Sequence, residues 1–257
     1  MKVIILCGGL GTRLSEETVN KPKPMVEIGS QPILWHIMKI YDKFGFNEFI
    51  LPLGYKGEYI KNYFINYKTI NSNLKIDLDS GEVSSINNPK ENWKVSLIDT
   101  GKKTLTGGRL LRLKEYVKDG TFMMTYGDGV SDINIDDLLN FHKSHGRIAT
   151  VTAVRPQARF GGLHINENNL VESFVEKPSS NENNESWING GYFVFNKQVF
   201  DYLEDDMTIL ERSPLENLSK DGQLMSFKHN GFWQCMDTIR DKEFLNQLLT
   251  NKNAPWV

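Results

Sequence analysis

The sequence predicts an α/β fold with a Rossmann-like, doubly wound and mainly parallel sheet. Short apolar runs that are typical of buried parallel strands recur along the 257 residues. Segments with apolar residues at helical spacing separate these runs, which is the alternation expected of a doubly wound sheet. A glycine follows several of the runs, for instance at Gly8, Gly54 and Gly127. Because ligands of such folds bind beyond the carboxyl ends of the strands, we expect the functional residues in the loops that follow them.

The N-terminal half begins with the apolar run VIIL at residues 3–6, which is expected to form a central strand. Ser30 is predicted to cap a helix over residues 31–44, and Gly45 to end it. We expect His36, on the apolar face of this helix, to pack through hydrogen bonds and not to bind a ligand. The other elements expected in this half are a strand at 49–53, a helix at 58–67, a hairpin and strands within 74–99, and a helix that opens at the loop 104–109 and runs to about 118.

The C-terminal half continues the same alternation. It contains no internal repeat and no linker, so we expect residues 1–257 to form a single domain. The expected strands cover residues 121–126, 148–154, 162–165, 170–175, 191–195, 223–228 and 231–235. The expected helices cover residues 135–145, 197–204, 214–220 and the end of the chain, and a strongly polar loop covers 178–187.

The composition is that of an ordinary globular protein, with 39 % hydrophobic and 24 % charged residues. Because 30 basic side chains nearly balance 32 acidic ones, no overall field favours nucleic acid or an anionic membrane as a partner. No apolar stretch approaches the roughly 20 residues needed to span a bilayer, and we expect a cytoplasmic protein. Cys7 and Cys235 suggest neither a disulfide framework nor a metal site and are expected to be buried thiols.

The loop after the first strand has the composition of a phosphate-binding site. In GGLGTR, at residues 8–13, three glycines let a ligand approach the backbone, and Arg13 offers a fork of donors suited to phosphate oxygens. Lys21 and Lys23 follow as point charges. The loop lacks both the G-x-G-x-x-G dinucleotide spacing and the Gly-Lys-Ser/Thr ending of a P-loop. From the glycines alone, a tight turn with solvated cations remains an alternative.

Two carboxylates are candidates for holding a metal ion. Asp128 lies between Gly127 and Gly129 at the end of an expected buried strand, and Asp237 also follows a short apolar strand. Hard oxygen ligands with few protein contacts suit Mg²⁺. On spacing alone the alternatives stay open: Gly-Asp-Gly could be merely a turn, and Asp237 could be the N-cap of the last helix.

Several motifs together resemble a known enzyme family. GGLGTRL followed by KPKPMV resembles the signature of sugar-1-phosphate nucleotidyltransferases. Nearly the whole chain resembles the branch that transfers cytidylyl groups, through KPKPMVEIG, PILWHIMK, GYKG, DTG, TGGRL, TYGDGV, RFG, EKP, NGG and FWQ with MDT and RDK. The resemblance implies transfer from CTP to glucose 1-phosphate, giving CDP-glucose and pyrophosphate, with Mg²⁺. It also implies a small inserted β subdomain and a homo-oligomer.

The resemblance also implies roles for individual residues. Arg13 and Lys23 would be catalytic, by offsetting negative charge as the sugar phosphate attacks the nucleotide in line; since that phosphate is already a nucleophile, no enzyme base is needed. Asp128 and Asp237 would share the Mg²⁺. Substrate contacts would come from Leu6, Gly8, Gly9, Leu10, Gly11, Thr12, Arg13 and Lys23 at the first loop, from Thr104, Thr106, Gly107, Gly108 and Arg109 around the base, from Gly127, and, on the sugar side, from Glu176, Lys177, Asn189, Gly190 and Gly191.

Plainer alternatives and rival functions accompany these assignments. Arg109 could be a solvated charge at a helix end, and Lys177 a surface lysine before Pro178. Cys7 and Cys235 stand where this branch often has Ala and Pro. The rival functions are transfer of a uridylyl or thymidylyl group, a glycosyltransferase that consumes a nucleotide sugar, and a sugar-nucleotide sensor without activity. The motif GGLGTR and Lys23 argue against the glycosyltransferase.

Overall fold

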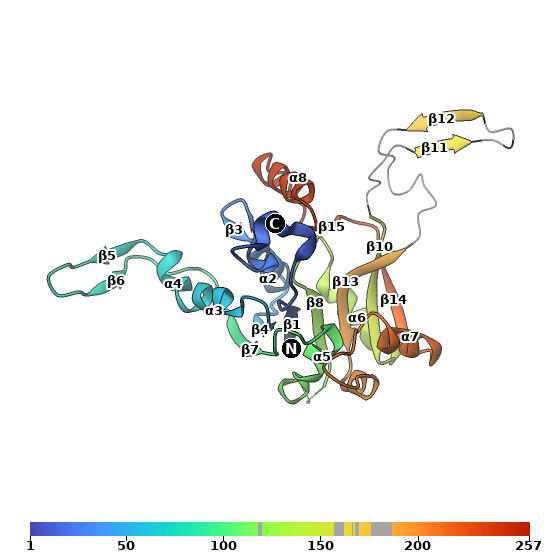
Figure 1. Ribbon diagram of the computed structural model, residues 1–257, viewed down its shortest axis with the longest axis horizontal. Coiled ribbons are helices and arrows are strands. Elements are labelled where there is room, and N and C mark those ends of the chain that lie inside the picture. Colours follow the sequence, from blue (N-terminus) through green and yellow to red (C-terminus); the bar gives the residue numbers. More distant parts are fainter. Residues whose placement is uncertain (118–119, 157–161, 166, 168–169, 176–186) are drawn as a thin grey trace.

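The computed structural model describes the chain apart from residues 118–119, 157–161, 166, 168–169 and 176–186. A seven-stranded sheet forms its centre (Figure 1). The strands in spatial order are β14 (Leu224–His229), β10 (Ala149–Val154), β13 (Ile188–Phe195), β8 (Phe122–Tyr126), β1 (Lys2–Leu6), β4 (Glu48–Leu53) and β7 (Lys94–Asp99). The expected strand at 3–6 is therefore central, as predicted.

The sheet is mainly parallel. Strand β1 runs parallel to both β8 and β4, β4 is parallel to β7, and β10 is parallel to β14. Only β13 in this sheet is antiparallel to its neighbours, β10 and β8. Because β1 and β8 pair in register, with Leu6 opposite Tyr126, the loops that follow the two strands leave the sheet side by side. The predicted α/β class is confirmed.

Helices flank the sheet, and most lie where the sequence predicts them. The α-helices are α1 (Ser15–Thr18), α2 (Ile33–Asp42), α3 (Gly57–Ile65), α4 (Tyr67–Ile70), α5 (Thr106–Leu111), α6 (Ile135–His145), α7 (Ser213–Lys220) and α8 (Ile239–Thr250). Short 3-10 helices cover Thr12–Leu14, Lys23–Met25, Lys114–Tyr116 and Lys197–Tyr202. Helix α6 has the predicted bounds, whereas the helix expected at 197–204 is of the 3-10 type.

Two predicted helix boundaries are wrong. Ser30 does not cap α2, because Gln31–Pro32 forms strand β3 and pairs with β2 (Glu27–Ile28), so that the helix begins only at Ile33. Helix α5 ends at Leu111 and a separate 3-10 turn follows, whereas a helix to about residue 118 was expected.

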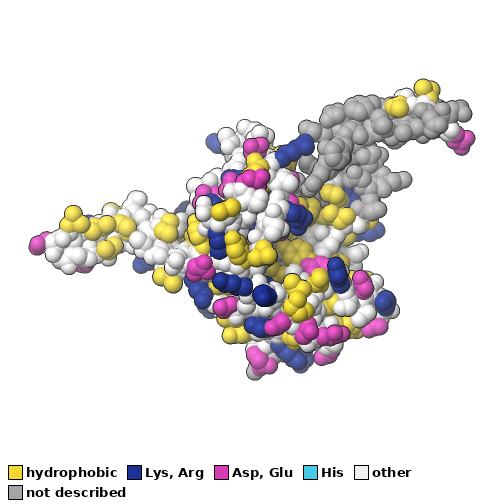
Figure 2. Space-filling view, viewed as in Figure 1, with side chains coloured by type: hydrophobic (Ala, Val, Ile, Leu, Met, Phe, Trp, Pro, Cys, Tyr) yellow, Lys and Arg dark blue, Asp and Glu magenta, His cyan; other side chains and the backbone are white. Residues whose placement is uncertain are grey.

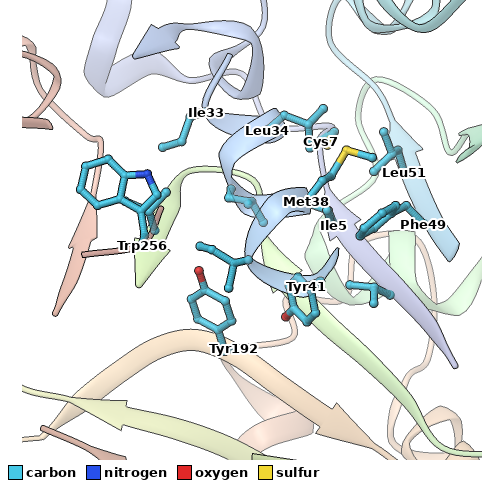
Figure 3. Packing of buried hydrophobic residues seen from close by; sticks show 14 of the residues in the cluster. Ile5, Cys7, Ile33, Leu34, Met38, Tyr41, Phe49, Leu51, Tyr192 and Trp256 are labelled. Carbon is cyan, nitrogen blue, oxygen red and sulfur yellow. The ribbon is translucent and has the colours of Figure 1, made fainter. Parts of the chain in front are cut away.

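Apolar side chains form a core on each face of the sheet. Successive residues of a strand point to opposite faces, and β1 accordingly places Val3 and Ile5 in one core and Ile4 in the other. In the first core, Met38 and Tyr41 of α2 pack near Ile5, as Figure 3 shows. Complete burial of one such side chain contributes roughly 1.5–3 kcal/mol. These cores fix the ends of β1, and so the loop that follows it.

A narrow extension projects from the main body. It consists of α3, α4 and the hairpin of β5 (Leu74–Ile76) and β6 (Val83–Ser85), which confirms the hairpin expected within 74–99 (Figure 1). Figure 2 shows hydrophobic side chains along its surface. The exposed ones include Ile65, Ile70, Ile76, Leu78, Val83 and Ile86. We call residues 57–89 the arm.

Two further strand pairs complete the fold. Strands β11 (Gly162–Ile165) and β12 (Val171–Val175) lie where strands are expected at 162–165 and 170–175, and they pair with each other. Strand β15 (Trp233–Cys235) pairs with β9 (Gly129–Ser131), which begins at the second glycine of the Gly-Asp-Gly motif. Within the described residues, no helix is long and apolar enough to cross a bilayer.

Candidate active site

A cavity of about 450 Å³ lies beyond the carboxyl ends of β1 and β8. It is the place where the sequence predicts the ligand. The predicted site residues that line it are Leu6, Gly9, Gly11, Thr12, Arg13, Lys23, Thr106, Gly127, Asp128 and Asn189. Glu176 and Lys177, and residues 178–186 of the polar loop, lie outside the described residues.

The glycines of the first loop serve different purposes. A Cβ atom on Gly8 would lie 2.1 Å from the Cζ atom of Arg109, so internal packing requires glycine there. Gly11 has a φ of +66°, in the left-handed region that favours glycine, and adopts it at the start of the 3-10 helix that carries Arg13. A Cβ on Gly9 would meet nothing within 4 Å. Of these three, Gly9 is therefore the position where the backbone faces open space.

Arg109 is buried beneath the first loop and is not a solvated charge at a helix end. Only 4 % of the residue is exposed. Its guanidinium donates hydrogen bonds to the carbonyl oxygens of Gly8 (2.9 Å), Leu53 (2.9 Å) and Gly101 (2.8 Å) and to Oγ1 of Thr100 (2.7 Å). Burial lowers the pKa of Arg109, and the charge of Asp99 opposes that shift. The side chain joins the end of β4 to the segments that follow β1 and β7. Its contact with substrate stays a prediction.

Lys23 lies between the two predicted metal ligands. Its Nζ is 2.6 Å from Oδ2 of Asp128 and also donates a hydrogen bond to Oδ1 of Asp237. The side chain is 10 % exposed. Burial lowers the pKa of Lys23, but the charges and hydrogen bonds of the two aspartates outweigh burial, and the net pKa is raised above its ordinary value. The ammonium group is therefore charged at neutral pH.

Arg13 completes a cluster of two cations and two carboxylates. Its Nη1 lies 2.5 Å from Oδ2 of Asp237, while its side chain remains 74 % exposed. Asp237 thus contacts Lys23 through one oxygen and Arg13 through the other. Because Arg13 is exposed at the cavity, it can exchange this carboxylate for an anionic ligand at little cost, as exposed ion pairs contribute only about 0–1 kcal/mol.

Strand pairing, not sequence proximity, brings Asp128 and Asp237 together. Cys235 pairs with Gly129, and the backbone N–H of Met236 donates to the carbonyl oxygen of Asp128 at 2.8 Å. The N-cap of α8 is Thr238, in a capping box with Asp241, so the alternative that Asp237 caps this helix is wrong. Gly-Asp-Gly is a turn between two strands, but one that presents its carboxylate to the cavity.

The donor set fits a hard divalent cation. The carboxylates of Asp128 and Asp237 converge on one point, which the ammonium of Lys23 approaches. Among the described residues, no group of three or more His, Cys, Asp or Glu side chains could hold a metal by itself. Mg²⁺ is commonly held by one or two carboxylates together with water and phosphate oxygens. A substrate phosphate would therefore have to complete such a site.

Two polar residues that line the cavity, Tyr126 and Glu211, were not among the site residues predicted from the sequence. Glu211 accepts hydrogen bonds from the hydroxyls of Tyr126 and Thr106, each at 2.6 Å, and Asn189 donates to the Tyr126 hydroxyl at 3.1 Å. Tyr126 could have been noticed, since it directly precedes the Gly-Asp-Gly turn. Glu211 lies in an irregular segment with no motif, so no local pattern indicates it.

The two glycines that follow Asn189 are also needed for packing. Gly191 has a φ of +79°, and a Cβ there would lie 2.6 Å from Cδ2 of Tyr126. The carbonyl oxygen of Gly190 accepts a hydrogen bond from Nε1 of Trp233 at 2.7 Å. Together these contacts hold Asn189 and Tyr126 at the cavity wall.

Comparison with known proteins agrees with this architecture. The family model described as nucleotidyl transferase matches residues 2–234. The chain belongs to the nucleotidyl transferase family. The resemblance drawn from the sequence motifs is thereby confirmed.

This nucleotidyl transferase has relatives that match along its full length. It is 51 % identical over 257 residues to the glucose-1-phosphate cytidylyltransferase of Salmonella typhi, with 100 % of this chain and 98 % of the relative covered. It is 47 % identical to the probable glucose-1-phosphate cytidylyltransferase of Bacillus subtilis, over 100 % and 99 % of the two chains. HddC from Yersinia pseudotuberculosis has a similar fold, with a TM-score of 0.69, 24 % identity and coverage of 96 % and 99 %.

Proposed function

We propose that this nucleotidyl transferase transfers a cytidylyl group from CTP to α-D-glucose 1-phosphate, giving CDP-glucose and pyrophosphate. The choice of substrates is supported by the full-length similarity to glucose-1-phosphate cytidylyltransferases, at 51 % and 47 % identity. The chemistry is supported by one observation above all: Arg13, Lys23 and Asp128 line the cavity beyond β1 and β8, and Asp237 forms ion pairs with both of these cations.

The proposed reaction is a direct in-line displacement. The phosphate oxygen of the sugar phosphate attacks the α-phosphorus of CTP, and the bond to the leaving pyrophosphate breaks. Lys23 and Arg13 would give up their carboxylate partners for phosphate oxygens and so offset the negative charge that accumulates as two anions meet. No residue has to remove a proton, because the attacking oxygen is already ionised. The chain's task is to position both phosphates and to hold charge beside them.

We propose that Asp128 and Asp237 hold a Mg²⁺ ion in the active complex. When bound, the ion would neutralise phosphate charge and polarise the phosphoryl group. The two carboxylates would position it between the loops that follow β8 and β15. Release of Lys23 from these carboxylates would then make its ammonium available to the substrate.

We assign the remaining predicted substrate contacts to the loops around the cavity. The first loop would hold the triphosphate, with Gly9 as the point of closest backbone approach. The loop 104–109 would face the base, and Asn189 and Gly190 would face the hexose together with Glu176 and Lys177. Arg109 would support the first loop from below.

A substrate panel tests the proposed function. Pyrophosphate release is measured with CTP, UTP, dTTP, ATP and GTP against a set of sugar 1-phosphates in the presence of Mg²⁺. We expect CTP with glucose 1-phosphate to give the highest kcat/KM. A preference for another pair would replace the named substrates but keep the reaction. Consumption of a nucleotide sugar without pyrophosphate release would contradict the proposal outright.

We further propose a cytoplasmic homo-oligomer built from a single-domain chain. The six exposed apolar side chains of the arm support self-association, since apolar surface gathered on one projecting element can mark a protein interface.

A further inference from the structure

Glu211 is a negative side chain in a cavity that is expected to receive phosphates. It lines the same cavity as Arg13 and Lys23. Within the described part of the chain, Glu211 forms no ion pair, and its side chain accepts hydrogen bonds from two neutral hydroxyls. A carboxylate in this position is not explained by the transfer reaction, which calls only for cations and a metal ion.

The hydrogen bonds around Glu211 all point toward it. The backbone N–H of Leu210 donates to Oγ1 of Thr106 at 3.0 Å, so the Thr106 hydroxyl gives its own proton to Oε2 of Glu211. On the other side, Asn189 donates through Nδ2 to the Tyr126 hydroxyl, which gives its proton to Oε1 of Glu211. Both hydroxyls are therefore used as donors toward one carboxylate.

The direction of these bonds is fixed at both ends. Oδ1 of Asn189 accepts from the backbone N–H of Gly191 at 2.8 Å, which places the amide nitrogen toward Tyr126. The Tyr126 hydroxyl accepts the amide proton of Asn189 and directs its own proton to Glu211. The wall formed by Thr106, Tyr126, Asn189 and Glu211, which we call the acceptor wall, thus presents the spare lone pairs of a charged carboxylate.

The cavity is consequently divided by charge. A phosphate is attracted by Arg13 and Lys23 and repelled by Glu211, because both phosphate and carboxylate are negative. A hydroxyl or amino group behaves in the opposite way: it can donate a hydrogen bond to a charged acceptor, and such bonds are stronger than those between neutral groups. The acceptor wall suits a neutral part of a substrate that carries such a donor.

We propose that Glu211 is a specificity-determining residue that accepts a hydrogen bond from a hydroxyl or amino group of a bound substrate. This inference rests on the proposed function. In that reaction the donor is either a hexose hydroxyl or the amino group of cytosine, which uracil lacks. Loss of one bond to a charged group should lower kcat/KM for the substrate concerned by roughly 10- to 100-fold.

The test compares E211Q with E216Q. Glutamine keeps the size of the side chain but removes the charge and replaces one acceptor oxygen with a donor. Glu216 is an exposed glutamate on α7 outside the cavity lining, and its substitution removes the same charge. For each variant, kcat/KM is measured while CTP and glucose 1-phosphate are varied in turn, with UTP and a set of monodeoxy glucose 1-phosphates as analogues.

Two outcomes support the proposal and identify the donor. If the cytosine amino group is the donor, E211Q lowers kcat/KM for CTP and loses the preference of wild type for CTP over UTP. If a hexose hydroxyl is the donor, E211Q lowers kcat/KM for glucose 1-phosphate. The variant then has similar kcat/KM values for glucose 1-phosphate and for the deoxy analogue that lacks this hydroxyl. In both cases the other substrate changes by less than about threefold, and E216Q behaves as wild type.

Unchanged discrimination overturns the proposal. If E211Q keeps all analogue preferences of wild type, or weakens both substrates equally together with a lower Tm, the carboxylate only supports the fold of the wall. Failure of the proposed function is distinguishable, because it would appear in the wild-type panel. The same ratios would then be measured with the pair that the wild type prefers.

Discussion

At the scale of single residues, the ammonium group of Lys23 can pair either with the two aspartates or with the phosphates of a substrate. This ammonium pairs with Asp128 and Asp237, and in the proposed reaction it would pair with phosphate oxygens instead. We expect K23A to lower kcat by about 100- to 1,000-fold, the usual effect of losing one group that stabilises developing charge. K21A is the matched control, because Lys21 carries the same charge two positions away and pairs with Glu27 at 3.5 Å, away from the cavity lining. Single-turnover rates of both variants test this, and a K23A rate within tenfold of wild type would contradict it.

Substitution of Asp128 or Asp237 should change how the activity depends on the Mg²⁺ concentration. Asp128→Asn and Asp237→Asn each remove one hard anionic ligand, so we expect each to abolish most activity and to raise the Mg²⁺ concentration needed for half-maximal rate. Removal of divalent ions with EDTA should stop wild type, and added Mg²⁺ should restore it. D136N, on the exposed face of α6, is the control for charge loss alone. Near-normal turnover of either active-site variant would refute the shared-metal assignment.

At the scale of secondary-structure elements, the first loop is held from below by a buried guanidinium. A Cβ at Gly8 would lie 2.1 Å from Cζ of Arg109, whereas a Cβ at Gly9 would meet nothing within 4 Å. We expect G8A to lower the free energy of unfolding by about 1–3 kcal/mol, as overpacking does elsewhere, and G9A to change it by less than about 0.5 kcal/mol. Urea unfolding of the pair measures this difference. Equal stabilities would mean that Arg109 can move aside.

A buried histidine of helix α2, His36, should make the free energy of unfolding decrease in mild acid. The indole N–H of Trp256 can only donate, so Nδ1 of His36 accepts from it at 3.3 Å, and Nε2 carries the proton that is donated to the carbonyl oxygen of Ile28 at 3.0 Å. The histidine is thus satisfied in its neutral form. Burial lowers the pKa of His36, and burial likewise lowers the pKa values of His142 and His145.

The direction of this effect follows from linkage. A lowered pKa in the folded state means that the unfolded chain takes up protons more readily, so stability is complete above the unfolded pKa of about 6.5 and decreases as the pH falls below it. We expect H36Q to reduce the slope of unfolding free energy against pH between 5 and 6.5 by up to one proton, or about 1.4 kcal/mol per pH unit. W256F should lower stability at every pH but keep the slope, because His36 stays buried. A slope that is unaffected by H36Q would contradict this origin.

Local signals explain which elements could be predicted from the sequence. Helix α6 lies where the sequence predicts it, since Asn134 caps it and Gly146 ends it with a φ of +65°, and both signals directly flank the helix in the sequence. The start of α2 was missed because it depends on the pairing of β2 with β3. In the site, Lys23 and Asp128 lie in recognisable motifs. Glu211 has no such motif, and its place beside Tyr126 is set by tertiary contacts alone.

At the scale of the whole molecule, the arm exposes more apolar surface than its own fold requires. Leu78 is 92 % exposed, Ile65 75 % and Ile86 71 %. An isolated two-stranded hairpin is marginally stable in water, and β5 and β6 pair over only three residues each. Burial against another copy would recover roughly 25 cal/mol for each Å² of apolar surface removed from water.

Charges on the arm should therefore weaken self-association without unfolding the main body. We expect L78D and I86D, singly and more strongly together, to lower the molar mass measured by light scattering during size-exclusion chromatography. M207D is the control, since Met207 is 62 % exposed but lies far from the arm in the sequence. Near-ultraviolet circular dichroism should remain unchanged in all variants, because the two cores do not include these side chains. If the double variant keeps the mass of a wild-type oligomer, the copies meet through another surface; if wild type itself is monomeric, the exposed apolar residues of the arm have a different partner.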